Sequence, residues 1–191
     1  MLRKIIFDMD DTLWGLDEKA AKMADIDYNK LVTYVSEENP LLTTAEKQRL
    51  INAYNSKELF KNIQWFDGIE RINTLKADVH IKSNIFLQEI DHIKRTQLNN
   101  VLQIPNENIH LDLVTDPKQK HIDPDTFIFV DDSPYNIIRS NAKHNIMLKR
   151  PWNTSSYGTA IIDSKPVIML DSLNDIIDVI ETLLYNKKIG E

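Results

Sequence analysis

Short apolar runs alternate along most of the chain with segments in which apolar residues recur every three or four positions. The strand-like runs cover residues 4–7, 79–83, 109–114, 126–130, 146–148 and 167–170. The helix-like segments cover residues 69–76, 88–102, 134–143 and 172–186. Strands that alternate with helices predict a parallel sheet with helices on both faces. The expected fold class is therefore α/β, a Rossmann-like doubly wound parallel sheet.

One long segment interrupts this alternation directly after the first strand. Apolar positions in residues 20–35 have helical spacing, and Thr43, with a Glu three residues later, predicts the start of a second helix. We interpret residues 16–66 as a small helical cap inserted after the first strand. The core domain would then consist of residues 1–15 and 67–191.

Composition narrows the function. The 191 residues are 42% hydrophobic and 27% charged, which is typical of a soluble globular protein. The chain has no cysteine, which excludes disulfide scaffolds, cysteine-bound metals and thiol nucleophiles. A net charge of −6 disfavours a nucleic-acid polymer as partner. The first apolar run is too short for a signal peptide or a membrane span, so we expect a cytoplasmic protein that has no membrane partner.

Paired acids follow two of the expected strands. Asp8 and Asp10 come after the first strand, and Asp131 and Asp132 come after the strand at 126–130. Ligands of open α/β sheets bind at the carboxyl ends of strands, so these carboxylates would meet if the two strands are neighbours. Clustered carboxylates repel one another, and an oxygen-preferring cation such as Mg²⁺ would relieve this repulsion. Such a site suits phosphoryl chemistry.

Acidic residues at strand ends also have simpler roles. They often only cap a helix or a turn. A calcium-binding loop that begins at Asp8 would need Gly at its sixth position and Glu at its twelfth, where the chain has Leu13 and Lys19. The occurrence of two strand-and-acid pairs in one chain favours the functional interpretation.

The segment Phe7-Asp8-Met9-Asp10-Asp11-Thr12-Leu13 resembles the first motif of the haloacid dehalogenase-like hydrolase superfamily, and Val130-Asp131-Asp132-Ser133 resembles its fourth motif. The resemblance implies that Asp8 is a nucleophile that forms an aspartyl-phosphate and that Asp10 is the general acid and base. It also implies a Mg²⁺ site formed by Asp131 and Asp132 with Asp8 and the Asp10 backbone carbonyl. Thr12, in the first motif, is assigned to substrate binding.

The two middle motifs of this superfamily supply a hydroxyl and a lysine. Ser83, at the end of the second strand, matches the hydroxyl that binds a phosphate oxygen, and the neighbouring Asn84 is expected to contact substrate. Lys120, eleven residues before Asp131, matches the lysine that neutralises the phosphoryl oxygens. Lys118 is the rival candidate.

A narrower resemblance concerns the substrate. Residues 59–70, 131–137 and 149–153 resemble segments of the 5′(3′)-deoxyribonucleotidase family, although Ser133 stands where that family often has Arg. The resemblance implies a nucleoside monophosphate as substrate. Trp14 and Phe60 flank the two linkers between cap and core, and we expect them to stack on the base, although cap–core packing is the simpler role for any one aromatic residue.

The resulting prediction is a Mg²⁺-dependent phosphomonoesterase whose partner is a small phosphomonoester, with a homodimer left open. One alternative is a phosphatase for sugar or amino-acid phosphates. A second is a catalytically silent, phosphate-binding module that keeps the fold. The acidic net charge argues against a phosphatase that processes nucleic-acid ends.

Overall fold

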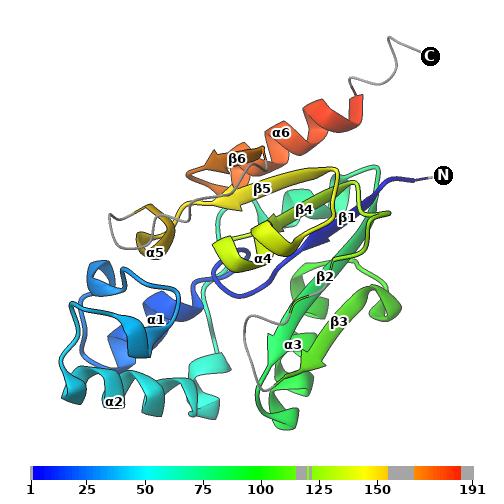
Figure 1. The fold of residues 1–191 in the computed structure, drawn as a ribbon. Helices are drawn as coiled ribbons and strands as arrows, with labels where there is room; N and C mark the ends of the chain where they lie inside the picture. The colour runs from blue at the N-terminus through cyan, green and yellow to red at the C-terminus, as the bar shows by residue number, and fades with distance from the viewer. Residues whose placement is uncertain (1, 115–119, 121, 155–165, 186–191) are drawn as a thin grey trace.

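A computed structural model describes residues 2–114, 120, 122–154 and 166–185 (Figure 1). Its centre is a six-stranded, all-parallel sheet with the strand order β3-β2-β1-β4-β5-β6. The strands are β1 (Lys4–Phe7), β2 (Asp78–Ile85), β3 (Ile109–Leu113), β4 (Ile128–Asp131), β5 (His144–Leu148) and β6 (Val167–Leu170). The predicted α/β fold class is confirmed.

The sheet is buried on both faces, which explains why its strands are continuous apolar runs. Ile5 and Phe7 of β1 belong to the larger core cluster, whereas Ile6 belongs to a smaller cluster on the opposite face. The larger cluster includes residues of α3 (Gln88–Val101) and α6 (Leu173–Tyr185). The helix α4 (Pro134–Arg139) contributes Ile137 to the smaller one, so helices cover both faces, as Figure 1 shows.

The first strand lies at the point where the strand order reverses. β1 pairs with β2 on one side and with β4 on the other, so that Phe7 lies opposite both Ile81 and Val130. The two strands that carry the acidic pairs are therefore neighbours, as the site prediction required. A crevice at the carboxyl ends of strands is expected at such a switch point.

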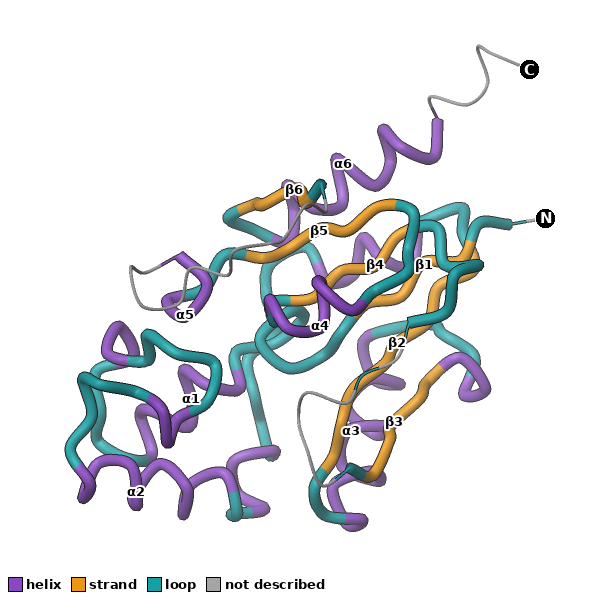
Figure 2. The backbone as a smooth tube through the Cα atoms, in the orientation of Figure 1, coloured by secondary structure: helices purple, strands orange, loops and turns teal. Residues whose placement is uncertain are grey.

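The segment 16–66 is helical, as predicted, but its elements are short. They are α1 (Leu16–Met23), η1 (Tyr28–Lys30), η2 (Ser36–Glu38), α2 (Thr44–Tyr54) and η3 (Lys57–Phe60). Thr43 and Glu46 form the predicted capping box at the start of α2. Figures 1 and 2 show this segment beyond the carboxyl ends of the strands, against one edge of the core.

Three predicted helices differ from the structure. The helical spacing at residues 31–35 does not produce a helix, because Asn39 holds this stretch as a loop by donating to Lys30 O (2.7 Å) and accepting from Leu41 N (2.9 Å). Residues 69–76 form a 3₁₀-helix, η4 (Ile69–Thr74), instead of an α-helix. The helix predicted at 134–143 ends at Arg139.

The chain returns from the helical segment to the core through Gly68. Its φ of +92° lies in the left-handed region, and a Cβ here would collide with Asn174 at the start of α6. Arg71 then ties η4 to α6 through an ion pair with Asp178 (2.6 Å). In the described part of the chain no helix has both the length and the apolar character that a membrane span requires.

Candidate active site

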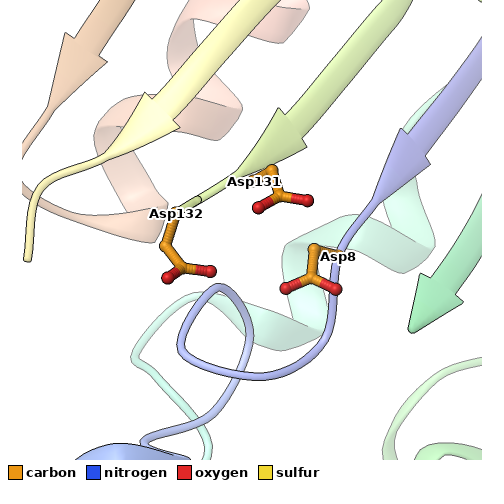
Figure 3. Close-up of side chains that lie close together, drawn as sticks. All are labelled: Asp8, Asp131 and Asp132. Atoms are coloured by element: carbon orange, nitrogen blue, oxygen red, sulfur yellow. The ribbon is translucent and has the colours of Figure 1, made fainter. Parts of the chain in front are cut away.

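Three buried carboxyl groups meet where β1 and β4 end (Figure 3). Asp8 follows β1 directly, Asp131 is the last residue of β4, and Asp132 comes next. One carboxylate oxygen from each lies within 4.8 Å of the others. The Asp8 backbone N–H donates to Val130 O (2.8 Å), which extends the β1–β4 pairing to the site itself. The parallel register therefore brings Asp8 together with the second predicted acidic pair.

Lys120 lies between two of these carboxylates. Its ammonium donates to Asp8 and to Asp131 Oδ2 (2.9 Å for Asp131), and only 5% of the residue is exposed. Burial opposes its charge, but the carboxylates of Asp131 and Asp8 together raise the pKa of Lys120 above its usual value. Lys120 thus stays charged in the site. The rival candidate, Lys118, lies outside the described residues.

The carboxyl groups carry more negative charge than Lys120 can balance. Burial, opposed by the attraction of Lys120 and aided by repulsion from Asp131 and Asp10, raises the pKa of Asp8 to about 7. Burial, and then repulsion from Asp131 and Asp8, raises the pKa of Asp132 well above its ordinary value. Buried carboxylates that repel one another in this way fit a hard divalent cation, for which oxygen is the preferred ligand. Asp8, Asp131 and Asp132 are the residues that would hold it.

Asp10 has different partners from this triad. One of its oxygens, Oδ1, accepts from Trp14 Nε1 (2.8 Å), and the other, Oδ2, accepts from Lys94 Nζ (2.6 Å) and Ser83 Oγ (3.3 Å). Its side chain is 24% exposed and borders a cavity. The second predicted acid thus lies beside the triad, with both oxygens held by protein donors.

Sequence reasoning missed Lys94. It lies on α3 between Ile90 and Leu98, at a four-residue spacing, and these three are the buried residues of that helix. A lysine in the buried stripe of an otherwise amphipathic helix is a signal that the sequence does carry, because a charged residue is rarely fully buried without a partner. Besides Asp10, the ammonium contacts Ser83 Oγ at 2.9 Å.

Several polar groups hold the clustered carboxylates in place. Asp131 accepts from Ser133 N (2.7 Å) and Asn136 Nδ2 (3.0 Å), and Asp132 accepts from Trp152 Nε1 (3.0 Å). Sequence reasoning did not assign these roles. Ser133 is itself fully buried. The site is therefore oriented largely by residues that follow β4 and β5.

A second group of orienting contacts involves the first motif. Thr12 is fully buried and donates to Asp132 Oδ1 (3.3 Å), so it contacts the carboxylate cluster and does not border the cavity. Trp14 is also fully buried, and its ring stacks on Trp65 with a centroid distance of 5.1 Å. Trp14 therefore supports Asp10 from behind and does not reach the cavity wall.

A cavity of about 490 Å³ opens between the core and the helical segment. This volume lies within the about 300–1,000 Å³ that is usual for small-molecule pockets. The predicted residues Asp8, Asp10, Phe60, Ser83, Asn84, Lys120 and Asp132 all line it. Further apolar and aromatic side chains complete the wall, among them Leu16, Tyr34, Ile51, Tyr54, Ile85, Phe86 and Ile90. The carboxylates and lysines thus share one pocket with a large apolar surface.

The sequence matches no protein-family model and no curated protein. Its structure, however, resembles solved structures over almost the whole chain. A hydrolase from Pseudomonas syringae has a TM-score of 0.58 and 13% identity, covering 95% of this chain and 99% of the other. A candidate β-phosphoglucomutase from Bacteroides vulgatus has a TM-score of 0.59 and 12% identity, covering 96% and 90%.

A third similar structure carries metal. It is a candidate haloacid dehalogenase-superfamily hydrolase from Bacillus subtilis, bound to magnesium, with a TM-score of 0.52 and 13% identity, covering 94% of this chain and 99% of the other. At these identities the likeness concerns the fold. The chain therefore has the haloacid dehalogenase-like fold, as its first and fourth motifs predicted.

Proposed function

We propose that this protein is a Mg²⁺-dependent phosphomonoesterase that works through an aspartyl-phosphate. The observation that carries the proposal is that Asp8 and Asp10 have different partners at the same cavity. Asp8 lies with Asp131 and Asp132, and Lys120 contacts Asp8 and Asp131, whereas Asp10 borders the same cavity with separate partners. Two-step phosphate transfer needs a nucleophile and, beside it, a second group that acts first as an acid and then as a base.

In the first step a carboxylate oxygen of Asp8 attacks phosphorus, and the bond to the ester oxygen breaks. Asp10 gives its proton to that oxygen, which leaves as an alcohol. In the second step water attacks phosphorus, Asp10 takes the proton of this water, and phosphate leaves Asp8. Mg²⁺ held by Asp8, Asp131 and Asp132 would supply charge neutralisation at the phosphoryl group.

The remaining groups serve the same transfer. The Lys120 ammonium would neutralise charge on Asp8 and on the phosphoryl oxygens, and the Ser83 hydroxyl would donate to one of them. The helical segment 16–66 would act as a cap that keeps bulk water out during the reaction. Phe60 and Asn84 would contact the leaving group in the cavity.

The substrate that we propose is a nucleoside monophosphate. The mostly apolar and aromatic cavity wall supports this choice, because a flat base needs such surfaces for stacking. A sugar phosphate is the second candidate, and the name of the similar Bacteroides vulgatus protein favours testing it. A silent phosphate-binding module would bind phosphate without turning substrate over.

The test is phosphate release from a panel of ribo- and deoxyribonucleotides, sugar phosphates and phosphoserine, with and without Mg²⁺. We expect metal-dependent release from nucleotides, and none from the Asp8→Asn variant. Asp112→Asn, which changes an exposed aspartate paired with Lys82, is the matched control. Release from sugar phosphates alone would contradict the proposed nucleotide substrate but would support the proposed mechanism. If the folded protein releases phosphate from no ester, the proposal that it is a phosphomonoesterase is refuted.

A further inference from the structure

Lys94 is a buried cation that the proposed two-step transfer does not yet use. Its side chain is 1% exposed, and its ammonium contacts Asp10 Oδ2 (2.6 Å), Ser83 Oγ (2.9 Å) and Asn84 O (3.5 Å). Burying an ammonium group is unfavourable unless well-placed partners offset its loss of hydration. These three residues all line the candidate active-site cavity.

Two aromatic rings flank the same ammonium. The centroid of Trp14 lies 6.0 Å from Nζ and that of Phe60 lies 5.8 Å away. Trp14 precedes the helical segment and Phe60 lies near its end, so Lys94 is located where both connections between the segment and the core pass. The cation therefore reaches from α3 to Asp10, beside both connections.

Fold stability alone does not account for a lysine here. Ile90 and Leu98, its neighbours along the buried stripe of α3, are both apolar. Replacing a buried ion pair by apolar side chains of similar volume is often neutral or stabilising. Apolar residues at both positions 94 and 10 would thus serve the fold, whereas removing only one partner leaves the other charge unpaired. The presence of the charged pair therefore needs another explanation.

We propose that Lys94 is a positioning residue that acts through Asp10. Together, Lys94 and Trp14 hold opposite oxygens of this carboxyl group, which fixes its plane and its distance from the leaving oxygen. The proposal rests on the proposed function, because it assigns Asp10 to proton transfer. Misplacing a catalytic group by about 1 Å costs about 10²-fold in rate, so loss of one of the two holders should be visible in kcat/KM.

The test compares two leaving groups in the Lys94→Met variant. With an alkyl phosphate from the panel, whose leaving oxygen needs a proton, we expect kcat/KM to fall by about 10–10²-fold. With p-nitrophenyl phosphate, whose leaving group is stable as an anion, kcat/KM should fall by no more than about threefold, because kcat/KM reports the first step and not the attack of water that both esters share. The Asp10→Asn/Lys94→Met double variant should be no slower than Asp10→Asn alone.

Lys82→Met is the matched control, since Lys82 pairs with Asp112 (3.4 Å) and does not line the cavity. It should leave both rates unchanged. The Lys94→Gln variant, measured in the same way, provides a second neutral side chain, and circular dichroism establishes that each variant is folded.

Equal loss with both leaving groups, or additive loss in the double variant, would overturn the positioning role, since a general distortion of the site gives that result. Unchanged rates in folded Lys94→Met and Lys94→Gln would overturn it as well. If the wild-type protein releases phosphate from neither ester, the proposed function itself fails. Wild-type turnover therefore separates the two failures.

Discussion

The buried carboxyl group of Asp8 should lower the stability of the metal-free fold, and this effect on the free energy of unfolding can be measured separately from turnover. Asp8 is 5% exposed, and its pKa rises from the ordinary value of 3.8 to about 7 in the fold. At about 1.4 kcal/mol per pH unit, this difference corresponds to an ionisation cost of up to about 4 kcal/mol at pH 8. We therefore expect Asp8→Asn to stabilise the metal-free protein while it abolishes turnover.

The sign of the pH dependence follows from proton binding. Between pH 3.8 and about 7, Asp8 is protonated in the folded protein and ionised in the unfolded chain. The folded state then binds more protons, so the wild-type free energy of unfolding falls as pH rises through this window. The asparagine of the variant cannot ionise, and its amide oxygen still accepts from Lys120. The advantage of the variant should open above about pH 4 and reach its full size above about pH 7.

The assay is urea denaturation followed by circular dichroism at pH 5 and pH 8, with a metal chelator present. We expect Asp8→Asn to gain about 1–4 kcal/mol at pH 8, the full value being an upper limit because the interior relaxes around a charge. The gain should be smaller at pH 5. Asp112→Asn should change stability by less than about 0.5 kcal/mol. An Asp8→Asn variant that is less stable than wild type at pH 8, or a gain equal at both pH values, would refute the reasoning.

The remaining predictions concern metal, substrate and backbone. Mg²⁺ at about 100 times its Kd should stabilise the wild type by about 2.7 kcal/mol, and Asp132→Asn should weaken Mg²⁺ binding at least about tenfold in calorimetric titration; unchanged affinity would exclude Asp132 as a ligand. Phe60→Ala should raise KM for a nucleoside monophosphate by about 5–100-fold, as steady-state kinetics will show, if Phe60 stacks on the base. Gly68→Ala should cost at least about 1–2 kcal/mol in thermal unfolding, because of the positive φ, and Asn174→Ala should recover the part due to collision; equal stability of the single and double Gly68 variants would show that no collision occurs.

Much of the fold follows from local patterns. Strands such as β1 and β4 are apolar on both faces, which predicts a sheet covered on both sides, and the capping box at Thr43 marks where α2 begins. The sequence also predicts that the acids after β1 and β4 lie close together, because the carboxyl ends of parallel strands meet at one edge of the sheet. Lys120 is favoured over Lys118 through the resemblance to the third motif, and in the structure Lys120 contacts Asp131.

Other features depend on contacts between distant parts of the chain. Residues 31–35 have helical spacing, but Asn39 bonds to the backbone on either side and holds a loop. Trp14 looks like a candidate for the cavity wall, yet its stacking on Trp65 turns it toward Asp10. In both cases spacing describes which residues are apolar, and packing decides which surface they contact.

Lys94 shows the difference between what the sequence predicts and what only the tertiary structure decides. Its place in the buried stripe of α3 is readable in the sequence, but its partners are not, because Asp10 is 84 positions away. The sequence by itself determined the strands, the helices that cover them, and the chemistry of the residues at the strand ends. The tertiary structure decided which of those residues share a cavity, through the strand order β2-β1-β4 and the packing of the helical segment against the core. Both depend on contacts between residues far apart in the sequence, which local patterns do not encode.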